Sequence, residues 1–396
     1  MLAPVPTLTS ARISPHIARK PSGVPATLAI LFNSPSVCMS RPTVATIHLD
    51  ALRANLSQVR RAAPTSKVLA VVKADGYGHG LERVAHALNG ADAFGVAAIA
   101  DAQRLRAAGL SQRIVLLSGI DEAADLPLLR QLQLDTVVHH SSQLRLLEAD
   151  RIAKPIRVWL KIDSGMHRLG FAPSEAANAF ARLRALPNVA PDIVWMTHFA
   201  RSDEFAADAT REQIAVFTEA TRDLPGQISL ANSAAVLGWP ASHADWVRPG
   251  GALYGLSVVE GRTAASFGLQ PAMTLSTGLI AINRLNKGER LGYGGSFEAV
   301  ADMCIGIAAI GYGDGYPRHA PTGSPVLVNG QRAVTVGRVS MDLLAVDLGT
   351  VGNPKVGDSV VLWGKGLAVE EVAAAAGTIS YELTCGITRR VRFIED

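Results

Sequence analysis

Short apolar runs alternate with helical segments through the first two-thirds of this 396-residue chain. KVLAVVK, rich in Val and Leu as in a strand buried on both faces, precedes LERVAHALNG, whose apolar residues recur at helical spacing. The pairing recurs in AFGVAA with DAQRLRAAG, in RIVLLSG with DEAADLPLLRQL, and in later pairs. Strands that each lead into a helix form parallel sheets. This many units predicts an α/β fold with an N-terminal (β/α)8 TIM-like barrel over residues 41–268.

The alternation of strands and helices ends beyond residue 269. MTLSTGLIAINRL, MCIGIAAIGYG, LLAVDL and DSVVLWG have strand character without intervening helices. In VLVNGQRAVTV, Asn329-Gly330 separates two alternating runs, which is a strong hairpin signal. LAVEEVAAAAG is a late helix that Gly377 ends. We therefore predict a C-terminal, mostly β domain over residues 269–396.

Residues 1–40 have a different character, with Pro, Ser and Arg but no acidic residue before Asp50. A basic stretch precedes a short apolar one, as in a targeting segment. Because Met39 directly precedes the regular sequence, we favour a disordered extension or a start site placed too early.

The composition indicates where the protein is located and which classes of partner it does not bind. Three cysteines (Cys38, Cys304, Cys385) match neither a disulfide framework nor a zinc site, so we expect no metal and a reducing, cytoplasmic location. No apolar run approaches the ~20 residues that span a bilayer, so we expect no membrane association. The net charge is +4 and the basic residues are scattered, so we expect no nucleic-acid partner.

Unusual polar residues end the predicted barrel strands, where barrel enzymes place their active sites. They are Lys73, Lys161, His198, Asn232 with Ser233, and Arg248 before Gly250-Gly251. Alone, each has a structural explanation, since a terminal lysine usually reaches solvent and a lone histidine usually packs in a core. Their occurrence together at the ends of the barrel strands favours a catalytic site. A buried lysine amine can form a Schiff base, and a glycine loop with a serine can hold phosphate, which indicates pyridoxal phosphate.

Nine segments in order also resemble the signatures of the bacterial alanine racemases. They are AVVKADGYGHG, WLKIDSGMHRLGF, THFARSDE, ANSAA, VRPGGALYGL, GYGGSF, GYGDGYPR, GRVSMD and TISYELTCGITRRV. The resemblance covers the chain from about residue 41 onward and implies a barrel followed by a β domain. The sequence departs from the commonest pattern at Ser164, Gly251 and Ser340, none of which has a proton-transfer role.

The resemblance implies two catalytic bases. Lys73 resembles the lysine that forms the internal aldimine with pyridoxal 5'-phosphate and then serves as one base. Tyr293 resembles the base on the opposite face, which the partner subunit of a homodimer contributes. Arg248 resembles the arginine bound to the pyridine nitrogen, and His198 the histidine that links this arginine to the tyrosine.

Further residues are implied to hold cofactor and substrate. Arg168 resembles the contact to the cofactor phenolate and the substrate carboxylate, and Lys161 a lysine carried as a carbamate that holds Arg168. Met341 resembles the residue whose backbone amide meets the substrate carboxylate. The implied phosphate contacts are Tyr77, Ser233, Gly250, Gly251 and Tyr381.

The implied activity is interconversion of L-alanine and D-alanine, which supplies D-alanine for peptidoglycan. Three alternatives share part of the pattern. A single-barrel pyridoxal-phosphate carrier lacks the β domain and an equivalent of Tyr293. A decarboxylase usually places an acidic residue where Arg248 stands. A periplasmic broad-spectrum amino-acid racemase is the closest alternative, although GMHRLG resembles the alanine-specific pattern.

Overall fold

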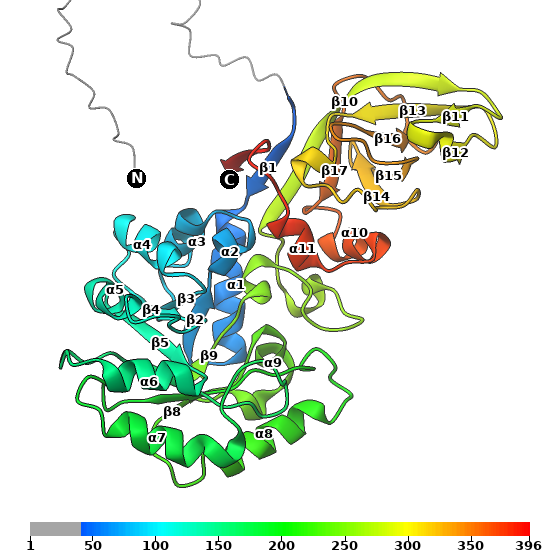
Figure 1. Ribbon diagram of the computed structural model, residues 1–396. Helices are drawn as coiled ribbons and strands as arrows, with labels where there is room; N and C mark the ends of the chain where they lie inside the picture. Colours follow the sequence, from blue (N-terminus) through cyan, green and yellow to red (C-terminus); the bar gives the residue numbers. More distant parts are fainter. Residues whose placement is uncertain (1–40) are drawn as a thin grey trace, which may run out of the picture. The chain divides into compact units, whose positions relative to one another are not determined.

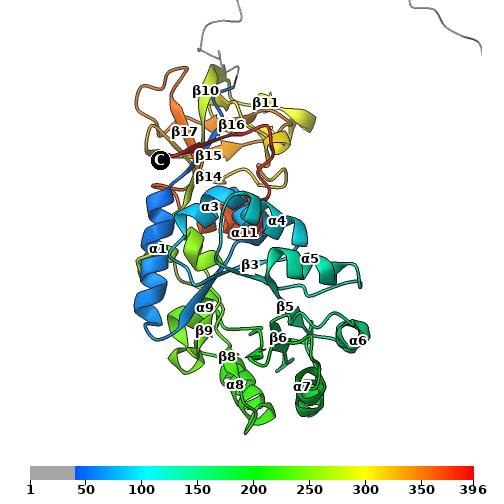
Figure 2. The ribbon, with the colours of Figure 1, turned by 90° about the vertical axis from the view of Figure 1, so that its left-hand side faces the viewer.

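The computed structural model describes residues 41–396, so the prediction for residues 1–40 and for Cys38 lies outside the described part. Residues 41–396 form one compact unit. It consists of a parallel barrel and a mostly antiparallel β domain, drawn in Figures 1 and 2.

Eight parallel strands close the barrel, and the helices lie outside them (Figure 1). The strands are β2 (Lys67–Val71), β3 (Ala93–Val96), β4 (Arg113–Leu116), β5 (Leu134–Val138), β6 (Val158–Lys161), β7 (Val194–Met196), β8 (Gln227–Ser229) and β9 (Trp246–Val247). The helices are α1 (Leu49–Ala62), α2 (Lys73–Tyr77), α3 (Leu81–Ala87), α4 (Ile99–Ala107), α5 (Asp125–Leu132), α6 (Ser141–Ala149), α7 (Ala176–Arg184), α8 (Ala209–Ala220) and α9 (Ser233–Gly238). The predicted barrel is confirmed.

The barrel interior is packed rather than hollow. Trp159 and Trp246 lie edge to face there, with ring centroids 5.4 Å apart, and both are buried among inward-facing valines. Chemistry is therefore restricted to the rim of the barrel, as in other barrels of this kind.

The β domain is an eight-stranded sheet in the order β13-β16-β15-β14-β17-β10-β1-β18, with a separate hairpin β11-β12. The strands are β1 (Val44–Ile47), β10 (Met273–Leu285), β11 (Arg290–Leu291), β12 (Phe297–Glu298), β13 (Met303–Ala308), β14 (Pro325–Val328), β15 (Gln331–Val336), β16 (Leu344–Asp347), β17 (Ser359–Trp363) and β18 (Arg392–Glu395), and the helices are α10 (Val369–Ala376) and α11 (Ser380–Cys385). The predicted hairpin is confirmed: β14 and β15 pair antiparallel, and Asn329 and Gly330 have φ of 47° and 77°.

The first strand differs from the predicted division. Val44–Ile47 lies within the segment 41–268 assigned to the barrel, yet it pairs antiparallel with β10 and parallel with β18. The described part of the chain therefore starts in the β domain and enters the barrel through α1. The reason is that a four-residue strand is stabilised by ladder hydrogen bonds on both edges, and β10 and β18 supply both partners.

The β domain also touches the segment after the first barrel strand. A Cβ at Gly78 would lie 2.1 Å from the Thr384 carbonyl oxygen of α11. Only glycine allows this close approach, so the lysine-bearing segment is held between the two domains. Among the helices of residues 41–396, none combines the length and apolar character that crossing a membrane requires.

Candidate active site

The fold brings most of the sequence-predicted residues to one end of the barrel. Lys73 follows β2, Lys161 ends β6, and Arg248 follows β9. These are carboxyl ends of parallel strands in one closed barrel, so they share a rim. The charges of Lys73, Lys161, Arg168 and Arg248 all act on His198, which follows β7. The predicted convergence is thus present in the structure.

Lys73 begins a rare left-handed turn. Ala74, Asp75 and Gly76 have φ of 53°, 53° and 63°, and Tyr77 has φ of 53°. Each non-glycine residue in this conformation costs about 1–2 kcal/mol, so the three cost roughly 3–6 kcal/mol. Sequence reasoning missed this turn, although glycines at alternate positions (76, 78 and 80) were a signal for it. Strain of this kind persists where surrounding structure enforces it, commonly at active sites.

The turn presents Lys73 at the rim. The Lys73 side chain is exposed, but the atoms around it partly desolvate the amine, and this effect together with the charge of Arg168 lowers the Lys73 pKa. A lowered pKa increases the fraction of neutral, nucleophilic amine at physiological pH. Arg168 lies in an exposed loop anchored by Asp163, whose carboxylate accepts the N–H groups of Gly165, Met166 and His167 at 3.0 Å.

A cradle of hydrogen-bond donors lies beside the lysine. The Ser233 hydroxyl accepts the Gly250 and Ala252 N–H groups at 2.8 and 3.2 Å. A Cβ at Gly250 would lie 2.4 Å from the Tyr77 hydroxyl, and a Cβ at Gly251 would lie 2.3 Å from the Tyr381 hydroxyl. The two glycines therefore make room for the two phenols.

These donors are available to a ligand. No residue within 41–396 hydrogen-bonds to the Tyr77 hydroxyl, to the Tyr381 hydroxyl or to the N–H of Gly251. Burial raises the pKa of Tyr77 well above its ordinary value, and burial with the charge of Asp203 raises the pKa of Tyr381 to about 12. Both phenols thus stay protonated. A cluster of neutral donors next to cationic side chains suits a phosphate group.

Arg248 is a buried cation with one free donor. Its Nη1 donates to the Ser229 carbonyl and hydroxyl oxygens at 2.8 and 2.7 Å, and its Nη2 donates to the carbonyls of Thr197 and Leu230. Within the described chain, no hydrogen bond uses its Nε. Desolvation lowers the Arg248 pKa to about 10, so the guanidinium remains charged at neutral pH. Arg248 can therefore donate one N–H to a ligand acceptor while the rest of its fork is fixed.

Lys161 and His198 are both affected by the cations of the rim. Desolvation and the charges of Arg248 and Arg168 lower the Lys161 pKa to about 8. Desolvation and the same two charges, with those of the two lysines, hold the His198 pKa well below its ordinary value, so the imidazole is neutral. No hydrogen bond within residues 41–396 joins His198 to Arg248 or to Tyr293. The link expected from the sequence is therefore not made inside this chain.

Two predicted residues lie away from the rim. Tyr293 begins a 3-10 turn (Tyr293–Gly295) between β11 and β12, and its exposed fraction is 72%. Figure 1 shows this hairpin at the outer end of the β domain, away from α2. Met341, with an exposed fraction of 52%, lies in the loop between β15 and β16. One chain alone therefore does not bring Tyr293 to Lys73.

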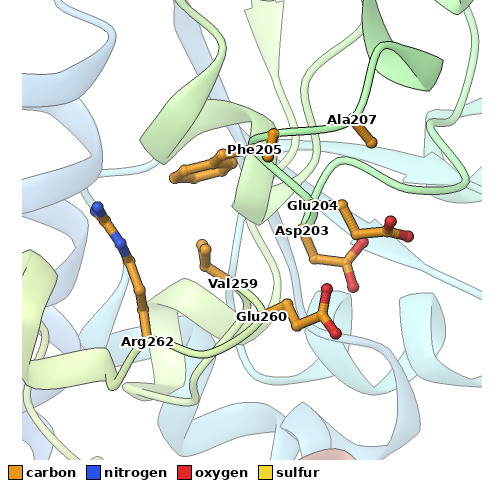
Figure 3. Close-up of a pocket in the computed structure, with 8 residues that line it drawn as sticks. Asp203, Glu204, Phe205, Ala207, Val259, Glu260 and Arg262 are labelled. Atoms are coloured by element: carbon orange, nitrogen blue, oxygen red, sulfur yellow. The ribbon is translucent and has the colours of Figure 1, made fainter.

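A cavity of about 470 Å³ lies on the loops that follow β7 and β9. Figure 3 shows the carboxylates of Asp203, Glu204 and Glu260 on one side of it and Arg262 with Phe205 on the other. One carboxylate of this wall, that of Asp203, adds to the effect of burial, which is the larger cause of the raised Tyr381 pKa. Within residues 41–396, no group of three or more His, Cys, Asp or Glu side chains is arranged to hold a metal ion.

A closed parallel barrel with a lysine of lowered pKa and a group of unpaired donors on one rim, joined to a mostly antiparallel β domain, is the architecture of a two-domain barrel enzyme. Comparison with known proteins identifies the family. Residues 47–258 match the family described as alanine racemase, N-terminal domain, and residues 272–395 match alanine racemase, C-terminal domain. The chain belongs to the alanine racemase family, and it is an isomerase.

Individual relatives support this assignment. The chain is 54% identical over 347 residues to alanine racemase of Shewanella baltica (strain OS185), covering 88% of this chain and 97% of that protein. The crystal structure of biosynthetic alanine racemase from Pseudomonas aeruginosa superposes with a TM-score of 0.88 at 47% identity, covering 90% of this chain and 99% of that one. Alanine racemase from Bartonella henselae, described with covalently bound pyridoxal phosphate, has a TM-score of 0.81 at 27% identity over 90% and 99% of the two chains. The resemblance seen in the sequence is confirmed.

Proposed function

We propose that this protein interconverts L-alanine and D-alanine with pyridoxal 5'-phosphate bound covalently to Lys73. The observation that carries the proposal is the pairing of a lysine of lowered pKa with a cradle of unused donors at the same rim. The Bartonella relative described with covalently bound pyridoxal phosphate supports the choice of cofactor.

The residues of the rim fit this cofactor. Tyr77, Ser233, Gly251 and Tyr381 would donate to its phosphate, with Gly250 leaving room for the Tyr77 hydroxyl. When bound, pyridoxal phosphate supplies an electron sink that makes the Cα proton of the amino acid removable. Arg248 would donate its free Nε–H to the pyridine nitrogen. The Arg248 pKa is about 10, so at neutral pH the guanidinium would donate a hydrogen bond to that nitrogen without transferring its proton. The pyridine nitrogen would stay unprotonated, which limits side reactions.

Inverting a stereocentre requires a base on each face of Cα. Lys73 serves one face, since desolvation and the charge of Arg168 lower its pKa and so raise the fraction of neutral amine that can accept a proton. We assign the other face to Tyr293 of a second copy of this chain. Arg168, with the Met341 amide of the second copy, would hold the substrate carboxylate.

Lys161 carries a specific modification in this proposal. Its pKa of about 8 leaves a substantial fraction of the amine neutral, and a neutral amine can add carbon dioxide to form a carbamate. The product would replace one positive charge with a negative one beside Arg168 and Arg248, whose charges now act against Lys161. It would hold Arg168 by charge.

A homodimer follows from the position of Tyr293. Exposed apolar side chains gather on neighbouring loops of the β domain: Tyr293 is 72% exposed, Met341 52% and Tyr312 37%. The Gly313 N–H donates to the Met341 carbonyl at 2.8 Å, which joins two of these loops. Exposed large apolar side chains that lie on adjacent loops are common at protein interfaces. We propose that it packs on the barrel rim of a second copy and inserts Tyr293 there.

The first test is enzymatic. The purified protein is incubated with L-alanine, serine, lysine and arginine, and formation of each D-enantiomer is measured. Alanine should react fastest, whereas comparable rates with lysine or arginine would favour the broad-spectrum racemase. Borohydride reduction followed by peptide mapping should place pyridoxal phosphate on Lys73, and an adduct at another lysine would defeat the assignment.

Two thiols, Cys304 and Cys385, are free, which supports a cytoplasmic location.

A further inference from the structure

A fully buried histidine lies next to the strained turn and has no assigned role. His79 has no exposed surface, and its Nδ1 lies 2.9 Å from the Tyr77 carbonyl oxygen. A carbonyl only accepts, so Nδ1 carries the proton and donates it. Nε2 has no hydrogen-bond partner in the described part of the chain. Burial, the largest cause, lowers the His79 pKa to about 4, so the imidazole is neutral at physiological pH.

The His79 ring is packed against the aromatic side chains of the cradle. Its centroid lies 4.8 Å from that of Tyr254, which in turn lies 4.7 Å from that of Tyr77. The Tyr254 hydroxyl donates to the carbonyl of Val71, the last residue of β2, at 3.0 Å. His79 therefore contacts both the Tyr77 carbonyl, at the end of the left-handed turn, and the Tyr254 ring, whose hydroxyl bonds the strand that precedes Lys73.

The turn joins the two residues proposed to hold opposite ends of the cofactor. Lys73 stands at its start and Tyr77 at its end. Backbone hydrogen bonds hold part of the turn, from the Gly76 N–H to the Val72 carbonyl at 2.9 Å and from the Gly78 N–H to the Ala74 carbonyl at 3.0 Å. Any relaxation of the remaining strain would move the Tyr77 hydroxyl relative to the Lys73 amine. The hydrogen bond from His79 acts on the peptide unit that follows Tyr77, where the strained run of non-glycine residues ends.

We propose that His79 is a positioning residue for racemisation: by donating Nδ1–H to the Tyr77 carbonyl, it holds the left-handed turn 74–78 and sets the spacing between the Lys73 amine and the Tyr77 hydroxyl. This inference rests on the function proposed above. Because His79 has no exposed surface, it would act through the backbone of the turn and not by contact with cofactor or substrate.

The test compares three substitutions. In His79→Asn the side-chain amide nitrogen takes nearly the position of Nδ1 and can still donate. His79→Leu fills a similar volume without a donor, and His79→Gln moves the donor one bond further out. His86→Leu, at an exposed histidine of α3, is the matched control.

Three measurements are made on each variant. They are the Kd for pyridoxal phosphate after removal of bound cofactor with hydroxylamine, the kcat and KM for alanine, and the crystal structure of the cofactor-free protein. His79→Leu should weaken cofactor binding and lower kcat by about tenfold or more, since small misplacement of reacting groups has effects of this size. The KM for alanine should change far less. His79→Asn should restore both quantities, and the φ values of residues 74–77 should turn negative only in the variants without a donor at Nδ1.

Each alternative outcome is informative. Equal losses in the Asn and Leu variants would mean that only packing matters and would overturn the proposal. Unchanged Kd and kcat in the Leu variant would do the same. Should the Leu variant not fold, the contrast between the Asn and Gln variants still decides. A parent protein that neither binds pyridoxal phosphate nor racemises alanine would refute the proposed function instead, while the φ values would still report on His79.

Discussion

Gly250→Ala offers the sharpest test of the phosphate cradle, because the added atom meets one identified group. The new Cβ would lie 2.4 Å from the Tyr77 hydroxyl oxygen, whereas real Cβ contacts stay beyond 3.0 Å. The Tyr77 hydroxyl must therefore move away until its distance from the new Cβ exceeds 3.0 Å. Its ring is confined by Tyr254 and Tyr381, with centroids 4.7 and 5.6 Å away, so we expect the phenol to leave its position over the glycine.

The expected magnitude follows from the loss of one hydrogen bond. A hydrogen bond to a charged group contributes about 1.5–3 kcal/mol. At about 1.4 kcal/mol per factor of ten, cofactor binding should weaken roughly 10- to 140-fold. Folding should change little, because the clash is with the end of a side chain. Gly90→Ala is the control, since the nearest atom to its new Cβ, from Leu56, is 3.8 Å away.

The assay is a double-mutant cycle in cofactor affinity. Each variant is stripped of cofactor, and its Kd for pyridoxal phosphate is measured by absorbance titration alongside its thermal unfolding. Tyr77→Phe removes the clashing oxygen and leaves the ring carbon 3.1 Å from the new Cβ, a close contact that a ring shift of a few tenths of an ångström relieves. In the Tyr77→Phe background, Gly250→Ala should therefore raise the Kd for pyridoxal phosphate by less than about threefold. Equal effects of Gly250→Ala in both backgrounds, or no effect in the parent protein, would show that the hydroxyl is not part of the cradle.

Three further predictions test the rest of the site. Arg248→Ala should abolish most racemisation and also destabilise the fold by about 1–3 kcal/mol, measured by urea unfolding, because the buried acceptors of its four hydrogen bonds lose their donor; near-parental turnover would refute its role. A chain starting at Met39 should match the full chain in activity and melting temperature, since Arg41 supplies the first described contact, 2.8 Å from a buried carboxylate; a loss would assign a role to residues 1–38. Tyr293→Phe mixed with Lys73→Ala should regain activity in mixed dimers, and no recovery after demonstrated subunit exchange would place both bases in one chain.

Much of the fold could be predicted because its signals are local. The barrel follows from strand–helix periodicity, and the β14–β15 hairpin from Asn329-Gly330, whose positive φ values are what that turn requires. The position of Val44–Ile47 could not be predicted in this way. Its partners, β10 and β18, lie far along the chain, and a short alternating strand carries no information about which edge it will join.

The candidate site likewise contains residues that the sequence could predict and residues that it could not. Lys73, Lys161, His198 and Arg248 could be selected from the sequence because each ends a predicted strand, and parallel strands in a barrel share a rim. His79 could not be selected, because a histidine in a glycine-rich segment is indistinguishable from an exposed one until the surrounding aromatic rings are in place. The same holds for the anchoring of Arg248 to three backbone carbonyls.

By itself, the sequence determined the order of elements, the family and the identity of the candidate catalytic groups, because spacing along the chain dictates helical and strand periodicity and family motifs are linear. Only the tertiary structure decided how these groups behave. The lowered pKa values of Lys73, Lys161 and His198 arise from desolvation and from charges brought near by distant segments. Tyr293 remains 72% exposed because the barrel and the β domain of one chain hold it away from the rim. Electrostatic energies depend on separation and burial in three dimensions, and neither quantity is encoded at any single position of the chain.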